Sequence, residues 1–185
     1  MRPEIVLIGP MNAGKSTQGR LLAAALGLPQ CAMDDVRWDY YAEIGYDKEH
    51  ARQIHDAEGF LGLYRYWKPF EIHALERVLA ERRDCVIDLG AGHSVYEDDA
   101  LFARARAALA PFANVVLLLP SEDPEESIRV LRARGGGSAP APNEFDFVAH
   151  FVRHPSNQDL ATVVVYTEGK TPEETRDEIL ARVQR

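Results

Sequence analysis

Short apolar runs alternate with longer amphipathic stretches along the chain. The continuous apolar runs lie at residues 5–8, 30–33, 85–88, 115–119 and 162–166. Runs of this length between polar segments are typical of buried strands. Apolar residues that recur every three to four positions predict helices over residues 16–26, 69–79, 97–110, 123–134, 143–152 and 171–183. This alternation predicts a three-layer α/β/α sandwich with a five-stranded parallel sheet.

Two helix starts are marked by their local sequence. The segments Asp123-Pro124-Glu125-Glu126 and Thr171-Pro172-Glu173-Glu174 each place a capping side chain before a proline and an acidic residue three positions later. The cap oxygen accepts hydrogen bonds from the free N–H groups of the first turn, and proline suits the first helical position. Gly27 and Pro29 are expected to end the helix after the first strand.

A glycine-rich loop follows the first strand. Residues 9–16 have the G-x-x-x-x-G-K-S spacing of a phosphate-binding loop. Glycines at both ends let backbone N–H groups surround a phosphate, and the positive end of the next helix faces the anion. Lys15 would contact the β- and γ-phosphates of ATP, and the Ser16 hydroxyl would hold Mg²⁺. The nucleotide-binding residues predicted in this loop are Gly9, Pro10, Met11, Asn12, Ala13, Gly14, Lys15, Ser16 and Thr17.

Acidic residues end the second and third strands. Asp34 and Asp35 follow the second strand, and Asp88 closes the third. Ligands collect at the carboxyl ends of parallel strands, so these carboxylates are expected beside the phosphate loop. Asp88 would hold Mg²⁺ with Ser16. At least one of Asp34 and Asp35 would meet Mg²⁺ or the substrate, and the alternative for one of them is a helix N-cap. The backbone would also approach a ligand closely at three small residues, Gly90, Ala91 and Gly92.

Two segments between the strands are candidates for covering a substrate. Residues 36–80 are rich in aromatic residues and largely helical by pattern, and their cation Lys68 would hold an anionic acceptor. The alternative for these aromatic residues is a buried core. Residues 132–143 carry Arg132 and Arg134 beside a glycine-rich stretch. This segment is either a flexible surface linker or a lid that brings both arginines to the transferring phosphate.

Composition limits the classes of function. A chain of 185 residues fits a single domain, residues 1–185, and its net charge of −8 argues against a nucleic-acid-binding or anionic-membrane surface. No apolar run approaches the roughly 20 residues that span a bilayer. Cys31 and Cys85 lie in apolar runs and are expected to be buried, reduced thiols. We therefore expect a cytoplasmic protein without a signal peptide, as a monomer or weak homodimer.

Over nearly its whole length the chain resembles shikimate kinases, a branch of the small P-loop kinases related to the nucleoside monophosphate kinases. The likeness is strongest over residues 9–27. Weaker likenesses lie at Met33-Asp34-Asp35-Val36, Trp67-Lys68-Pro69-Phe70-Glu71, Gly90-Ala91-Gly92 and Arg153-His154-Pro155-Ser156-Asn157. The resemblance implies ATP and Mg²⁺ as cofactors and a final strand and loop, up to Pro172, that border the adenine. It also implies acceptor contacts from Asp34, Asp35, Lys68, Arg153 and the turn at residues 90–92.

The departures from the family pattern concern the acceptor side. Met33 replaces the first aspartate of the acidic motif, Lys68 replaces an arginine, and Ala91 interrupts a triple glycine. Asn157 stands where a tyrosine is expected. A lysine is a point charge, so it does not read a planar carboxylate as a guanidinium does. The sequence therefore favours a kinase of this lineage with a different acceptor.

The function predicted is transfer of the γ-phosphoryl group of ATP to a hydroxyl of a small metabolite. Lys15, Arg132 and Arg134 would stabilise the transferring group, and Asp35 would orient the acceptor hydroxyl or take its proton. Three alternatives stay open: a nucleoside or nucleotide kinase, an antibiotic kinase, and an ATP-binding protein without catalytic activity.

Overall fold

A parallel sheet forms the centre of the fold, and the computed structural model describes residues 4–137, 139–141 and 143–184. Its five strands are β1 (Ile5–Ile8), β2 (Gln30–Ala32), β3 (Val86–Asp88), β4 (Asn114–Leu119) and β5 (Val163–Tyr166). They lie in the order β2-β3-β1-β4-β5, and every neighbouring pair is parallel. In the central strand, Val6 is in register with Ile87 on one side and Val115 on the other. The predicted three-layer α/β/α fold is confirmed.

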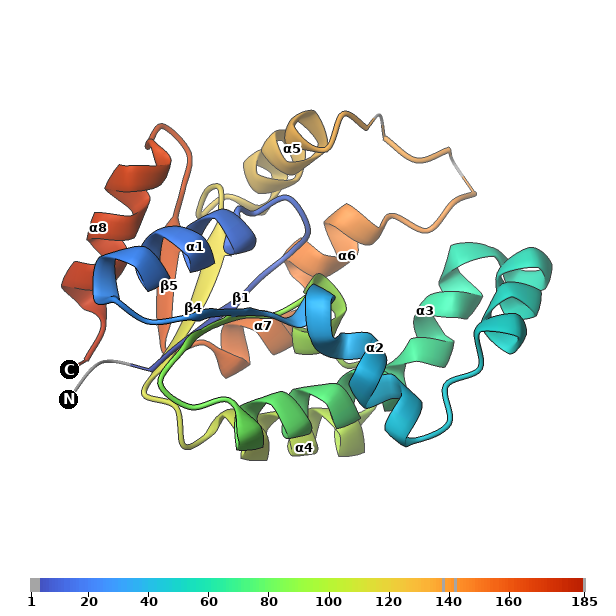
Figure 1. Cartoon of the computed structure of the whole chain (residues 1–185). Coiled ribbons are helices and arrows are strands. Elements are labelled where there is room, and N and C mark those ends of the chain that lie inside the picture. The colour runs from blue at the N-terminus through green and yellow to red at the C-terminus, as the bar shows by residue number, and fades with distance from the viewer. Residues whose placement is uncertain (1–3, 138, 142, 185) are drawn as a thin grey trace.

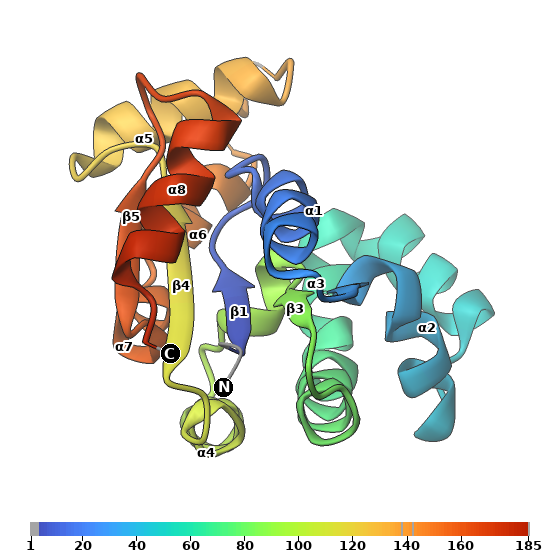
Figure 2. The same cartoon turned by 60° about the vertical axis from the view of Figure 1, so that its left-hand side comes forward.

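Helices cover both faces of the sheet (Figures 1 and 2). One face is covered by α1 (Lys15–Leu26) and α8 (Pro172–Arg182), and the other by the second half of α3 (Lys48–Glu81), α4 (Asp99–Leu109) and α7 (Pro155–Leu160). Helix α2 (Met33–Glu43) begins directly after β2, the 3₁₀ turn η1 (Ala91–Ser94) follows β3 closely, and α5 (Pro124–Arg134) begins five residues after β4. The short helix α6 (Phe147–Arg153) packs against α5.

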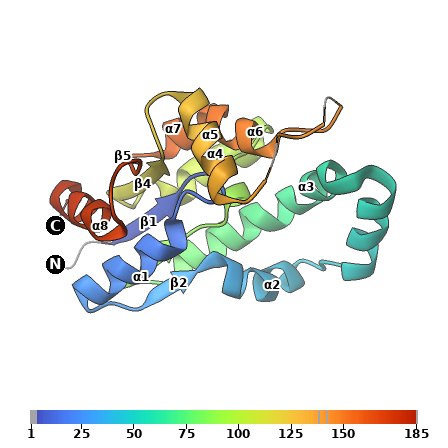
Figure 3. The ribbon, with the colours of Figure 1, turned by 90° about the horizontal axis from the view of Figure 1, so that it is seen from above.

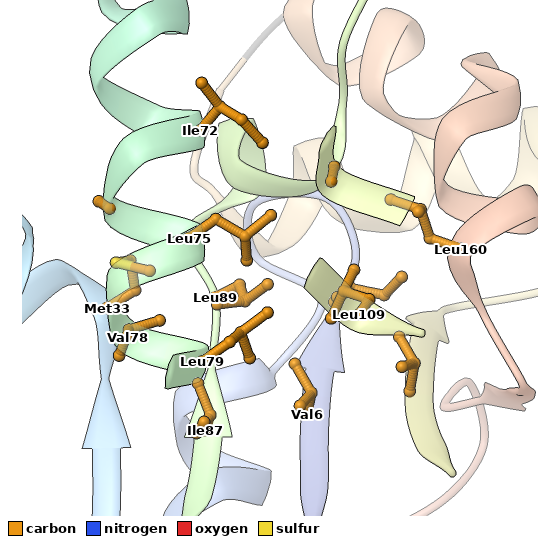
Figure 4. Close-up of a cluster of buried hydrophobic side chains, with 14 of the residues drawn as sticks. Val6, Met33, Ile72, Leu75, Val78, Leu79, Ile87, Leu89, Leu109 and Leu160 are labelled. Atoms are coloured by element: carbon orange, nitrogen blue, oxygen red, sulfur yellow. The ribbon is translucent and has the colours of Figure 1, made fainter. Parts of the chain in front are cut away.

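The hydrophobic core lies in two layers, one on each side of the sheet. Val6 and Ile8 of β1 belong to one layer, whereas Ile5 and Leu7 belong to the other, because successive strand residues point to opposite faces. Figure 4 shows the first layer, where apolar side chains of α3 face the sheet. All four residues of β1 are fully buried, which is the arrangement that a continuous apolar run predicts for a doubly covered sheet.

The predicted helix starts at both proline-containing segments are confirmed. Asp123 accepts a hydrogen bond from the backbone N–H of Glu125 at the start of α5. Thr171 and Glu174 form a reciprocal capping box at the start of α8. Gly27, with φ of 62°, ends α1 in the left-handed conformation that its sequence position indicated.

Several element boundaries differ from the prediction. The helix predicted over residues 69–79 is the end of the longer α3, with Pro69 inside it. Residue 33 begins α2 and does not belong to the second strand. The helix predicted over residues 143–152 begins at residue 147, because Asp146 caps it by accepting from the N–H of Ala149. Helix α7 was not predicted; it begins at Pro155, where His154 serves as the cap.

The segment proposed to cover a substrate extends beyond the sheet. Helix α3 bends at Gly59, whose φ of 67° and ψ of −165° are not helical. Helix α2, the outer half of α3 and the described residues of the connection between α5 and α6 extend on the side away from both termini (Figure 3). Two positions of the predicted lid over residues 132–143, namely 138 and 142, lie outside the described residues.

Two further expectations can be compared with the structure. Cys31 and Cys85 are buried free thiols, as expected. Within the described ranges, none of the helices combines the length and the apolar character needed to cross a membrane.

Candidate active site

The turn between β1 and α1 is concave and tightly packed. Gly9, Asn12 and Gly14 have φ values of 132°, 63° and 95°, and such left-handed positions turn backbone N–H groups toward a common centre. A Cβ atom at position 9 would lie 2.5 Å from the carbonyl oxygen of Leu118 in β4, so only glycine fits there. The N-terminus of α1 at Lys15 adds its positive dipole end. This geometry suits a phosphate group.

Lys15 lies buried under this turn. Its Nζ atom donates hydrogen bonds of 2.8 Å to the carbonyl oxygens of both Gly9 and Pro10. Burial lowers the pKa of Lys15 to about 8, although the carboxylates of Asp34 and Asp88 oppose this shift. The Lys15 ammonium therefore has neutral carbonyls as its hydrogen-bond partners. A bound phosphate group would supply the negative charge that stabilises its charged form.

Asp88 ends β3 directly beside the phosphate-binding turn. Its carboxylate is buried and accepts hydrogen bonds from Gln30 Nε2, at 2.8 Å, and from the Ser16 hydroxyl. Burial raises the pKa of Asp88, while these two hydrogen bonds and Lys15 oppose the rise. A Cβ atom at Gly19 would lie 2.9 Å from Asp88 Oδ1, so α1 packs closely on the end of β3. Ser16 and Asp88 thus lie together at the phosphate-binding turn, and their oxygen atoms are donors of the kind that Mg²⁺ prefers. A magnesium site here stays a prediction.

Two cavities open on either side of the turn. The α8-side cavity has a volume of about 260 Å³ and is lined by Asn12, Ala13, Gly14, Thr17, Gln18, Arg134, Thr167, Lys170, Pro172 and Thr175. The α2-side cavity has a volume of about 350 Å³ and is lined by Met11, Asn12, Gly14, Lys15, Ser16, Thr17, Asp34, Leu89, Gly90 and Ala91. Both cavities share three residues of the turn. A ligand in one cavity therefore lies next to a ligand in the other.

Of the two neighbouring carboxylates after β2, the structure brings Asp34 and not Asp35 to the phosphate-binding turn. Asp34 lines the α2-side cavity. Asp35 lines a different cavity, together with Cys31, Arg82 and other residues at the amino ends of β2 and β3. Both belong to the first turn of α2, where consecutive side chains point about 100° apart. The structure therefore places Asp34, and not Asp35, in the lining of the cavity beside the phosphate-binding turn. The role of either carboxylate toward the acceptor stays a prediction.

The small residues after β3 pack closely against neighbouring side chains, and their predicted approach to a ligand stays a prediction. A Cβ atom at Gly90 would lie 2.8 Å from His93 Nδ1 and 3.1 Å from Asp34 Oδ1. His93 is buried, its Nε2 atom lies 3.3 Å from the Tyr41 hydroxyl, and burial lowers its pKa well below the usual value. Its Nδ1 atom has no hydrogen-bond partner among the described residues. A neutral imidazole thus lies behind the turn that carries the α2-side cavity.

Lys68 was predicted to hold an anionic acceptor, but its ammonium group lies in a buried network. Its Nζ atom donates to Glu71 Oε2 at 2.6 Å, to the carbonyl of Gly92 at 3.0 Å and to that of Val95 at 2.9 Å. These three bonds use all of its N–H donors. Burial raises the pKa of Glu71, while Lys68 opposes the rise. A Cβ atom at Gly92 would lie 2.1 Å from Glu71 Oε1, so this glycine makes room for the carboxylate. In this structure Lys68 joins α3 to η1.

The arginines predicted to reach the phosphate or the acceptor take different positions. Arg134 lines the α8-side cavity, where its Nη1 atom donates to Thr167 Oγ1 at 3.2 Å. Arg132 pairs with Asp146, the cap of α6. Arg153 is exposed and pairs with Glu125 of α5. Neither Arg132 nor Arg153 lines the α2-side cavity.

Sequence reasoning missed several residues that shape the site. Gln30 holds Asp88 and also donates to the carbonyl of Ser16 at 3.2 Å. Gln18 fixes the loop before α8 by donating to the carbonyl of Pro172 at 2.8 Å. No motif in the sequence marked either glutamine. Pro172 itself lines the α8-side cavity, and its contact with the adenine stays a prediction.

Comparison with known proteins agrees with this geometry. The sequence profile of the shikimate kinase family matches residues 11–184. The shikimate kinase of Streptomyces coelicolor is 33% identical over 193 residues, which cover 98% of this chain and 96% of that protein. That of Chromohalobacter salexigens is 32% identical over 183 residues, which cover 99% and 93%.

The chain belongs to the shikimate kinase family. It is an ATP-dependent small-molecule kinase.

Solved structures confirm the fold. The shikimate kinase of Acinetobacter baumannii, solved in complex with shikimate, matches with a TM-score of 0.62 and 23% identity, covering 96% of this chain and 90% of that one. A gluconokinase from Sinorhizobium meliloti has a TM-score of 0.53 and 14% identity, covering 97% and 90%. At these identities the likeness concerns the P-loop kinase fold alone.

The low pKa of Lys15 predicts pH-dependent nucleotide binding by this shikimate kinase family member. A bound phosphate favours charged Lys15, so the free enzyme must take up a proton to bind ATP once the pH exceeds about 8. We expect the Kd for ATP, measured by calorimetry without a divalent cation, to rise by up to about tenfold per pH unit above that value.

Lys15→Met provides the control for this titration. It should bind ATP weakly, and its Kd should lack the rise that begins near pH 8. A native Kd that stays constant from about pH 7 to about pH 9.5 would contradict the lowered pKa.

The buried pair of Lys68 and Glu71 predicts a stability effect. Lys68→Met should lower the free energy of unfolding by about 3–5 kcal/mol, because it leaves the Glu71 carboxylate buried without its partner. The double variant Lys68→Met, Glu71→Gln should be more stable than the single variant, since no buried charge remains. Urea denaturation measures both. A single variant with native stability would show that Lys68 has no structural role.

Proposed function

We propose that this enzyme transfers the γ-phosphoryl group of ATP to a hydroxyl of a small metabolite other than shikimate. The observation that carries this proposal is the position of Lys68. Lys68 occupies the position at which the family has an arginine that binds the acceptor. Its ammonium group is hydrogen-bonded to Glu71 and two backbone carbonyls. Arg153, the second expected cation, pairs with Glu125 away from the α2-side cavity. Both departures alter how a carboxylate would be recognised.

The two cavities give the reactants separate places. ATP would place its phosphates in the turn at residues 9–16 and its base in the α8-side cavity, beside Arg134 and Pro172. The acceptor would occupy the α2-side cavity, which Asp34 and Lys15 both line. This arrangement follows the positioning and charge stabilisation that phosphoryl transfer requires.

Each group near the phosphates has a role in the proposed reaction. The phosphorus forms a bond to the acceptor oxygen as its bond to the β–γ bridging oxygen breaks, and ADP leaves. Lys15 stabilises the charge on the phosphoryl oxygens. Asp34 orients the acceptor hydroxyl and takes its proton. Ser16 and Asp88 would hold Mg²⁺, which neutralises phosphate charge when bound. Arg132 stays a candidate for contact with the nucleotide if the segment after α5 moves.

The acceptor is tested by ADP release in the presence of ATP and Mg²⁺. The panel comprises shikimate, other hydroxy acids, sugars, nucleosides and aminoglycosides, with Lys15→Ala as the blank. We expect a hydroxy acid other than shikimate to stimulate ADP release most, because the cations expected to bind shikimate are engaged elsewhere. Strongest stimulation by shikimate would overturn the altered acceptor. Nucleosides or aminoglycosides as the best acceptors would favour those kinase classes, and stimulation by none would favour a binding protein.

The acceptor-facing carboxylate is tested by a matched pair of variants. Asp34→Asn should lower kcat by about 100-fold or more, the usual effect of removing a positioned proton acceptor. Asp35→Asn changes the adjacent residue in the same helical turn and should alter kcat by less than about twofold. Steady-state kinetics with the best acceptor measures both. If Asp35→Asn has the larger effect, the assignment of Asp34 is wrong.

A further inference from the structure

Arg37 of α2 is an arginine with few polar partners. Its Nη1 atom lies 3.5 Å from Asp34 Oδ1, and this is its single ion pair within the described residues. Its Nε atom is shielded from solvent and has no hydrogen-bond partner among the residues that the structure describes. The side chain is 23% exposed. A guanidinium has five N–H donors, so Arg37 keeps unused donors next to a carboxylate that lines the α2-side cavity.

The position of this guanidinium is fixed by aromatic rings. Its central carbon lies 4.5 Å from the ring centroid of Trp38 and 5.7 Å from that of Trp67. Stacking on an aromatic ring leaves the edge of the guanidinium plane free, and that edge matches the two oxygens of a carboxylate. Arg37 is thus oriented before any ligand binds.

The charges around Arg37 are otherwise compensated. Glu71 is paired with Lys68, and His93 is neutral. Arg37 acts on both electrostatically, since its positive charge lowers the pKa of each. Arg37 is connected to the α2-side cavity through Asp34, which lines it. An anion beside Asp34 would find unused donors on the Arg37 guanidinium, whereas Lys68 has no donor left for it.

A band of aromatic rings continues from Arg37 across three helices. The centroids of Trp38 and Trp67 lie 6.4 Å apart, those of Trp67 and Phe60 5.8 Å, and those of Phe60 and Phe147 4.7 Å. Trp38 and Phe60 are 37% and 42% exposed, so part of this aromatic band faces solvent. Its rings supply flat apolar surface for a ligand.

The aromatic band is continuous with the α2-side cavity. Phe147 packs in one apolar cluster with Met11 and Ala91, and both of these residues line that cavity. Helices α2 and α3, which carry Trp38, Phe60 and Trp67, extend beyond the sheet at this side of the molecule (Figure 3). The aromatic band therefore borders the same site as Asp34.

We propose that Arg37 is the residue that recognises the acceptor, and that the acceptor is a hydroxylated carboxylate with a flat apolar ring. The carboxylate binds the free edge of the Arg37 guanidinium, the ring lies against the aromatic band, and the hydroxyl reaches Asp34. This inference rests on the proposed function, because it names the class of molecule that fills the acceptor site. It assigns the binding of the acceptor's carboxylate to Arg37 of α2 and not to Lys68.

The test measures binding separately from turnover. Isothermal titration calorimetry of the full chain uses two matched probes, 3-(hydroxymethyl)benzoate and 3-(hydroxymethyl)benzamide, which share the ring and the hydroxyl and differ in charge. A third probe, 4-hydroxybutyrate, keeps the carboxylate without the ring. We expect the benzoate to bind at least about tenfold more tightly than either of the other two, as a charge-assisted bidentate contact and a ring contact both predict.

Variants connect that preference to Arg37. Arg37→Met should remove the preference for benzoate over benzamide. Arg37→Lys should restore only part of it, because a lysine keeps the charge but lacks the planar pair of N–H donors of a guanidinium. Arg65→Met is the matched control, since Arg65 is an exposed arginine of α3, and it should keep the native preference. The chain has two tryptophans, and both flank Arg37, so quenching of tryptophan fluorescence should accompany binding to the native protein.

The outcomes separate this inference from the proposed function. Equal binding of benzoate and benzamide, no binding of benzoate, or an unchanged preference in Arg37→Met would each overturn the inference, whatever the kinase activity. An Arg37-dependent preference supports it even if no probe is phosphorylated. In that case the failure to release ADP with any acceptor would count against the proposed function alone.

Discussion

The fold depends on how closely the turn after β1 approaches β4. Because Gly9 lies against the carbonyl of Leu118, the turn cannot accept a side chain at this position. The same turn fixes the Lys15 ammonium through the carbonyls of Gly9 and Pro10. The backbone turn that packs on β4 therefore also fixes the position of a cation at the carboxyl edge of the sheet. The phosphate-binding part of the nucleotide side is built from this turn and the start of α1.

The acceptor side has a different physical basis. It is carried by α2, η1 and the outer half of α3, which extend beyond the sheet and are joined to one another by side chains. The bond network of Lys68 with Glu71 and η1 and the edge-to-face rings of Trp38 and Trp67 are such contacts. A substitution there changes a few side chains and leaves the sheet intact. This difference explains how one chain can resemble its family closely in residues 9–27 and depart from it on the acceptor side.

Much of the fold followed from local patterns, because strands buried on both faces are continuously apolar and the helix caps have definite side chains. The meeting of Ser16 and Asp88 was also predictable, since both positions follow from the carboxyl ends of neighbouring strands. The choice between Asp34 and Asp35 was not, because it depends on the rotation of α2 about its axis. The partners of Lys68 could not be read from the sequence either. They come from η1 and from Glu71, one turn away, and only the packing of α3 on η1 determines that burial.

The arrangement of charges connects the nucleotide side and the acceptor side of the site. The chain carries a net charge of −8, so anionic ligands are attracted only where cations are fixed and incompletely paired. Lys15 meets this condition beneath the turn, where its partners are neutral carbonyls. Arg37 meets it beside Asp34, where the contact of 3.5 Å is longer than a good charge-assisted hydrogen bond. Asp34 contacts Arg37 and acts electrostatically on Lys15. A molecule with its hydroxyl at Asp34 and its negative charge at Arg37 would direct that hydroxyl toward the phosphate over Lys15, which is the geometry that phosphoryl transfer requires.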